Sequence, residues 1–211
     1  MDARRALLRG LFDHAPLFPP ASMSPKDALA EDECALRSEH AWLLGRFVCP
    51  AGFPPVAGRE LAVVSQGAEV QGDFTFLEGV DLDEVAARGA GAKVRCGGKT
   101  VPSVDELAAF IRGCRGRGLA FKATAGLHHA YPTAENEHGF LNLLAAAVFG
   151  LEEEALSASP GSFQLDAQSF RWDGRAAQAD ELSRARATLI HSIGSCSFFE
   201  PVDELRELGI L

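Results

Sequence analysis

The sequence predicts an α/β protein built as a reduced or distorted (β/α) barrel of the TIM-barrel type. Between residues 81 and 150, short apolar runs alternate with amphipathic helical segments, as in parallel βαβ units with right-handed crossovers. Polar residues and glycines gather just past the ends of the predicted strands. The chain has 211 residues, whereas eight full units take about 250, so a reduced barrel is expected. An open, mostly parallel sheet flanked by helices is the alternative.

The first eighty residues are predicted to form two helices and four short strands. A short helical stretch and the strand-like FDHA precede a proline-rich loop. Ser24 and Pro25 then provide an N-cap and a first-turn proline for a helix that ends near Gly45. Three further strands, rich in β-branched and aromatic residues and bounded by Pro, Gly and Gln-Gly turns, are predicted at residues 46–50, 60–65 and 74–80.

The middle of the chain shows the clearest alternation of helices and strands. Ser103 and Glu106 are spaced as a capping box, which predicts a helix beginning at this point. A histidine-rich loop separates the second of two strands from a largely buried helix. In chain order, the expected elements are a helix at 81–91, a strand at 92–98, a helix at 102–118, a strand at 120–126 and a helix at 138–150.

The last third of the chain is less regular. Residues 162–174 are expected to form one strand or a hairpin around Asp166. A helix is predicted at 179–193, a strand at 194–201 and a final helical turn after it. No repeat or linker divides the chain, so residues 1–211 are expected to form a single domain.

Composition limits the classes of partner. With 20 Lys and Arg against 29 Asp and Glu, the net charge is -9, which disfavours a general binder of nucleic acid or anionic membranes. The five cysteines include no C-x-x-C pair, so neither a disulfide framework nor a structural zinc site is expected. No signal peptide and no apolar stretch of about 20 residues is present. We therefore expect a cytoplasmic protein without a cofactor; its oligomeric state stays open.

Charged residues on two predicted strands indicate a binding site. Alternation places Lys93 and Arg95 on one face of their strand and Lys122 and Thr124 on one face of the other. Parallel strands are usually apolar on both faces, and burial of an unpaired charge costs several kcal/mol, so these cations need an explanation. Glycines at the strand ends would let backbone N–H groups approach an anion; they are Gly97, Gly98 and Gly126.

We interpret these residues as a cradle for a phosphate or carboxylate at the carboxyl ends of the strands, where such folds bind ligands. In the alternative interpretation, the cations pair with Glu78, Asp13 or another buried carboxylate and only hold strands together. The cradle is the preferred hypothesis.

Three of the six histidines, His128, His129 and His138, fall within eleven residues. Adjacent histidines on an extended segment face opposite sides, so only one of His128 and His129 can face a given site. We expect a general acid/base or hydrogen-bonding role rather than metal binding, because no recognised metal-ligand spacing is present. Cys196 is expected to be inert packing.

The predicted function is a pocket for a small anionic metabolite, in a lyase- or aldolase-like or isomerase-like enzyme. A non-catalytic binding protein and a metal-dependent hydrolase using the histidines are the alternatives. The residues expected to carry the chemistry are Lys122, Lys93, Glu78, His128 and His129. Those expected to bind the ligand are Arg95, Gly97, Gly98, Thr124, Gly126, Asp13, His138 and Asn142.

Two resemblances add to this interpretation. The segments FDHAPLFPPAS, AKVRCGG, FKATAGLHHAY, HGFLNLL and GSCSFFEPVDELRELG resemble an uncharacterised family of bacterial proteins, which implies no activity. AKVRCGG and FKATAGL resemble the paired lysine strands of deoxyribose-phosphate aldolase and its class I relatives. That resemblance implies that Lys122 forms an imine and that Lys93 lowers its pKa. The two strands occur here in the opposite order, and Arg95 is additional.

Overall fold

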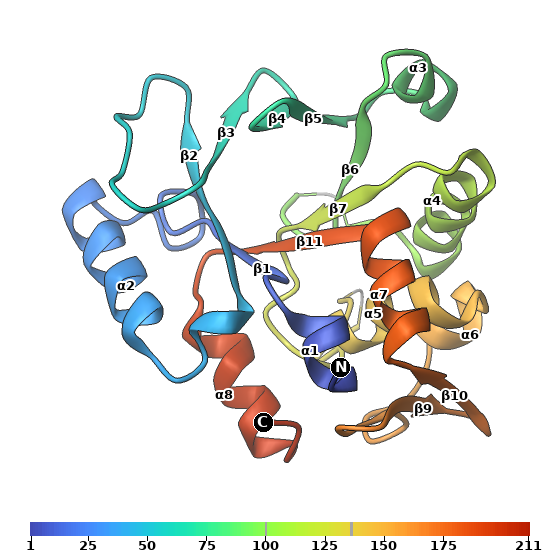
Figure 1. The fold of residues 1–211 in the computed structure, drawn as a ribbon. Helices are drawn as coiled ribbons and strands as arrows, with labels where there is room; N and C mark the ends of the chain where they lie inside the picture. Colours follow the sequence, from blue (N-terminus) through green and yellow to red (C-terminus); the bar gives the residue numbers. More distant parts are fainter. Residues whose placement is uncertain (100, 136) are drawn as a thin grey trace.

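Eight strands close into a barrel in this computed structural model, which describes residues 1–99, 101–135 and 137–211 (Figure 1). The strand order is β1–β11–β7–β6–β5–β4–β3–β2. Every neighbouring pair is parallel except the two made by β4, which is antiparallel to β3 and β5. The barrel strands are β1 (Phe12–His14), β2 (Leu44–Pro50), β3 (Leu61–Ser65), β4 (Ala68–Gln71), β5 (Phe74–Glu78), β6 (Gly91–Arg95), β7 (Phe121–Thr124) and β11 (Ile190–Ser195). The prediction of a barrel is thus confirmed, as a closed barrel of parallel and antiparallel strands. The alternative prediction, an open sheet, was wrong.

The helices lie around the outside of the barrel (Figure 1). They are α1 (Ala3–Leu8), α2 (Pro25–Arg37), α3 (Leu82–Ala87), α4 (Val104–Arg117), α5 (Phe140–Phe149), α6 (Glu152–Leu156), α7 (Ala179–Thr188) and α8 (Phe199–Glu207), with a 3₁₀ turn at Ala41–Leu43. A separate antiparallel sheet contains β8 (Gln164–Leu165), β9 (Ser169–Trp172) and β10 (Arg175–Gln178). In the described residues, no helix is long and apolar enough to cross a bilayer.

The helix signals in the sequence are confirmed at their starts. The Ser24 hydroxyl accepts a hydrogen bond from the backbone of Asp27, and Pro25 occupies the first turn of α2. At α4, Ser103 and Glu106 form both bonds of the capping box. These bonds satisfy N–H groups that a helix start leaves without an intrahelical partner.

Several elements differ from the sequence prediction. Helix α2 ends at Arg37 rather than near Gly45, because the chain from Leu44 onward pairs with β1. The prediction omitted β4, and it extended a helix through the segment that forms the first part of β11. In β11, Ile190 and Ile193 pair with neighbouring strands, so sheet pairing overrides the apparent helical pattern.

Strands β1 and β7 direct an apolar side chain outward and the next, charged one inward. On β1, Phe12 packs edge-on against Phe140 of α5, with ring centroids 5.4 Å apart, while Asp13 points into the barrel. On β7, Phe121 packs against Phe110 of α4 while Lys122 points inward. The hydrophobic core therefore lies between the barrel wall and the helices. The interior of the barrel can hold polar and charged side chains.

Gly97 and Gly126 allow the loops after β6 and β7 to touch. A Cβ on Gly97 would lie 2.7 Å from the Cα of Gly126. We expect Gly97→Ala to lower the free energy of unfolding by about 1–3 kcal/mol, because overpacking displaces backbone. Gly116→Ala is the control: it lies within α4, its Cβ would meet nothing within 4 Å, and it should add about 0.5–1 kcal/mol. Urea unfolding measures both, and a stable Gly97→Ala would contradict the close approach of the loops.

Candidate functional site

Lys122 forms the centre of the barrel interior. Its side chain is fully buried, and its Nζ donates to Asp13 Oδ2 at 2.6 Å and to Glu69 Oε1. Asp13 comes from β1 and Glu69 from β4, so the lysine joins strands that are not its neighbours in the sheet. Burial of three charges is tolerated only where each has a partner.

A chain of alternating charges runs from this centre to the rim. Glu69 also lies 3.5 Å from the Nζ of Lys93, which lies 3.2 Å from Oε2 of Glu78. Arg95 follows, with its Nε 3.9 Å from Oε1 of Glu78. We call this set the charge chain; its members in order are Asp13, Lys122, Glu69, Lys93, Glu78 and Arg95.

Neutral groups donate further hydrogen bonds to the carboxylates at the buried end of the charge chain. The side-chain amide of Gln71 donates to Asp13 at 3.3 Å and to Glu69 at 2.9 Å. The Ser192 hydroxyl donates to Asp13 at 2.7 Å, and the backbone N–H of Arg46 does so at 2.6 Å. Asp13 therefore accepts bonds from four groups, which fixes its position.

These contacts determine the protonation of the central pair. Burial alone would raise the pKa of Asp13, but the charge and hydrogen bond of Lys122, with the N–H of Arg46 and the hydroxyl of Ser192, lower it below its usual range. Burial alone would lower the pKa of Lys122, but the charges of Asp13 and Glu69 outweigh burial and raise it. Lys122 is therefore an ammonium at neutral pH, although Lys93 and Arg95 carry like charges nearby.

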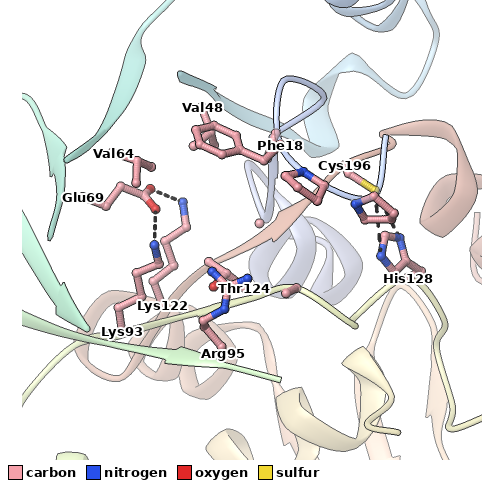
Figure 2. Close-up of a pocket in the computed structure, with 15 residues that line it drawn as sticks. Phe18, Val48, Val64, Glu69, Lys93, Arg95, Lys122, Thr124, His128 and Cys196 are labelled. Atoms are coloured by element: carbon pink, nitrogen blue, oxygen red, sulfur yellow. Dashed lines mark hydrogen bonds and ion pairs between the residues drawn. The ribbon is translucent and has the colours of Figure 1, made fainter. Parts of the chain in front are cut away.

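A cavity of about 150 Å³ opens above the lysines at the carboxyl ends of the parallel strands (Figure 2). Figure 2 shows Glu69 bridging the ammonium groups of Lys93 and Lys122 on one side of it. Apolar side chains from the loop after β1 and from β2 and β3 form another wall. The lining residues are Ala15, Phe18, Pro19, Pro20, Val48, Val64, Glu69, Lys93, Arg95, Lys122, Thr124, Ala125, His128, Gly194 and Cys196.

His128 and His129 diverge, as expected for adjacent residues on an extended segment. His128 lines the cavity, and its Nδ1 lies 3.0 Å from Oε2 of Glu200 on α8. The side chain of His129 is 52% exposed and lies 3.7 Å from Glu204. Cys196 also lines the cavity, with its Sγ 3.9 Å from both ring nitrogens of His128. Because burial raises the pKa of the Cys196 thiol, it is a thiol rather than a thiolate at neutral pH.

Several residues singled out in the sequence lie elsewhere. The Nε2 of His138 lies 2.7 Å from the carbonyl of Pro102, and the buried Asn142 donates to the carbonyls of Ala155 and Ala158. Their positions fit a structural role better than the predicted ligand-binding role. Gly97, Gly98 and Gly126 do not line the cavity. Among the described residues, no group of three or more His, Cys, Asp or Glu is placed to hold a metal ion.

Sequence reasoning missed Glu69, which contacts both lysines, and Gln71, which donates to Asp13 and Glu69. Glu69 and Gln71 occupy the inward face of β4, a strand that the sequence analysis does not predict, while Val70 between them is 38% exposed. The available signal was the polar–apolar–polar alternation of Glu69, Val70 and Gln71 between two glycines. Ser192 was assigned to a helix, and only its pairing with Lys122 in β11 reveals its place.

No protein-family model matches the sequence, and searches of curated proteins and of solved structures returned no significant match. The two resemblances therefore rest on the quoted segments alone, and the geometry of the cavity carries the functional argument.

Removal of the Lys122 ammonium should reveal how much free energy the burial of Asp13 and Glu69 costs. We expect Lys122→Met to lower the free energy of unfolding at pH 7 by about 3–5 kcal/mol, because Asp13 and Glu69 lose their counter-charge. The deficit should shrink as the pH falls from 7 to 4, since the unpaired buried carboxylates of the variant take up protons in this range, while the lowered pKa keeps Asp13 of the wild type ionised. Arg112→Met, which breaks a half-exposed pair with Glu153, should cost less than about 1 kcal/mol. Urea unfolding between pH 4 and 7 tests this, and a deficit independent of pH would contradict the assignment.

Proposed function

We propose that the cavity binds a small metabolite with an anionic group and a carbonyl, and that the protein moves a proton on it, as a lyase or isomerase does. The observation that carries the proposal is the side-by-side placement of two ammonium groups. Lys93 and Lys122 are register partners on β6 and β7, and both line the cavity. Such a pair of fixed donors suits an oxygen that gains negative charge during a reaction.

Arg95 is the cation best placed to receive the anionic group. Among the described residues, each lysine has two carboxylate neighbours within 3.5 Å, whereas Arg95 has one, at 3.9 Å. Its side chain is 52% exposed at the rim of the cavity. A guanidinium can bind a carboxylate or phosphate through two parallel hydrogen bonds, and the Thr124 side chain, which also lines the cavity, can add a third.

The size of the cavity limits the substrate. A volume of about 150 Å³ equals that of an engineered cavity that holds one benzene molecule, also about 150 Å³. The enclosed part of the ligand therefore has about six heavy atoms, which suits a short-chain keto or hydroxy acid. A phosphate group would lie outside this volume, at the open rim near Arg95, and a nucleotide base would not fit.

His128 is the group best placed to transfer the proton. Glu200 holds its Nδ1, as the carboxylate of a hydrolase triad orients its histidine. The imidazole can then exchange a proton with a ligand carbon or oxygen. Glu69, which contacts both lysines, is the alternative base on the opposite side of the bound carbonyl.

A non-catalytic binding protein is the second candidate. It is favoured by the saturation of Asp13, Glu69 and Lys122 with mutual hydrogen bonds, which leaves these groups little freedom to react. Both candidates share the binding step, so binding and turnover need separate experiments.

Binding is tested by thermal unfolding with three- to six-carbon keto acids, hydroxy acids and their phosphates. Compounds that fit should raise the melting temperature of the wild type by mass action. Arg95→Gln should lower the affinity about 10-fold or more, because it removes a charge-assisted hydrogen bond of about 1.5–3 kcal/mol. Arg112→Gln, a similarly exposed arginine on α4, is the matched control and should bind normally. Equal shifts in the wild type and Arg95→Gln would refute the role of Arg95.

Turnover is tested by proton exchange. For a compound that binds, NMR in D₂O should show exchange of a hydrogen next to the carbonyl, and His128→Gln should slow this exchange about 10²–10⁴-fold. Borohydride should trap no adduct on Lys122 at pH 7, because a protonated amine does not form an imine. A reduced adduct lost in Lys122→Arg would instead support the aldolase-like role, and binding without exchange would favour the non-catalytic candidate.

A further inference from the structure

A second cavity lies at the opposite end of the barrel, where the parallel strands begin. Its volume is about 670 Å³, and it is separated from the first by the buried part of the charge chain. The polar and aromatic residues that line it are Arg46, Gln71, Phe74, Arg117, Thr188 and His191. The proposed function does not use this cavity.

His191 connects the second cavity to the charge chain. Gln71 donates from its amide nitrogen to two carboxylates, so its carbonyl oxygen faces Nε2 of His191 at 3.0 Å and that nitrogen carries a proton. Arg46 Nη1 lies 3.4 Å from the same nitrogen. Because an arginine only donates, this contact sets positive charge against an N–H group and is not a hydrogen bond.

Arg186 adds a positive charge that forms no ion pair within residues 1–99, 101–135 and 137–211, although the more distant Asp13 acts to raise its pKa. Its Nη2 donates to the carbonyl of Arg9, but its Nη1 is shielded from solvent and has no hydrogen-bond partner in the described part of the chain. Burial lowers the pKa of Arg186 to about 10, and Arg186 in turn helps to lower the pKa of His191. Arg186 lies near the end of α7, next to Ala187 and Thr188, which line the cavity.

The groups that face His191 are mostly cationic. Burial is the largest cause that lowers its pKa; Asp13 of β1 raises it, while Arg46 of β2, Arg186 of α7 and Lys122 of β7 lower it. The ring of Phe76 on β5 lies beside it, with centroids 5.0 Å apart. The carboxylate that pairs with Arg46 is Glu60, which is 77% exposed and so screens this charge weakly.

We propose that the second cavity binds a small oxyanion, such as phosphate, sulfate or the carboxylate of a metabolite, between Arg46 and His191. Arg186 does not itself line the cavity, but its Nη1, shielded and without a partner among the described residues, adds to the positive charge that attracts the oxyanion. The carboxyl ends of α4 and α7 also border the cavity, and their carbonyl dipoles oppose an anion. This places the oxyanion on the Arg46 side, where it stabilises the protonated form of His191.

The test measures the pKa of His191 by NMR titration of the full-length protein in sodium sulfate and in sodium chloride at equal ionic strength. Arg95→Gln serves as the background, so that the first cavity lacks its anion-binding cation and the outcome is independent of the proposed function. We expect the pKa of His191 to be higher in sulfate than in chloride. Arg46→Gln should abolish this difference, and Arg184→Gln, an exposed arginine on α7 outside this cavity, should keep it.

Arg186→Met should also reduce the difference in His191 pKa between sulfate and chloride. If Arg186→Met fails to fold, Arg46→Gln alone tests the proposal. Equal pKa values in sulfate and chloride would overturn the proposal, as would a difference that persists in Arg46→Gln. A His191 pKa that changes with protein concentration, with dimers in sedimentation, would assign the cavity to a carboxylate of a second copy of the chain and also overturn it.

Discussion

The contact of Lys122 with Asp13 and Glu69 is the constraint on which the barrel depends. All three side chains are buried, and an unpaired charge there would cost several kcal/mol. Glu69 reaches the lysine because β4 runs antiparallel between β3 and β5 and directs its polar residues inward. Asp13 needs the N–H of Arg46, and the preceding Gly45 must lack a side chain because its Cβ would lie 2.2 Å from Asp13 Oδ1. The geometry of β1, β2 and β4 therefore positions the two carboxylates that pair with Lys122.

Stability alone does not explain why a barrel should contain such an interior. Replacement of buried ion pairs by well-packed apolar side chains is often neutral or stabilising, and eight-stranded barrels of this size can be filled by apolar side chains. The charge chain does, however, hold the ammonium groups of Lys93 and Lys122 at the base of a cavity with fixed geometry. Preorganised charge of this kind contributes to binding and catalysis because it needs no reorganisation when a ligand arrives. The polar interior thus favours a functional explanation.

The sequence predicts the inward cations and two of their three carboxylate partners, but not Glu69. Period-two alternation placed Lys93 and Lys122 on the same inward face, and both are buried. It also suggested that they pair with Glu78 and Asp13, which they do. Glu69 shows the same alternation, but a strand of four residues after a tight turn is too short for the pattern alone to predict it. Its contact with Lys122 spans 53 positions and exists only after barrel closure, which no local pattern encodes.

The contacts with Asp13 and Glu69 that offset the cost of burying Lys122 also limit its chemistry. The resemblance to aldolase strands implies an amine whose pKa is lowered by a neighbouring lysine. In this barrel Lys93 does lie beside Lys122, but Glu69 lies between their ammonium groups and contacts both. The carboxylate cancels the repulsion that would release a proton, so the pKa of Lys122 is raised rather than lowered. A ligand in the cavity would then meet two hydrogen-bond donors rather than a nucleophile, which is why proton transfer fits this site better than imine formation.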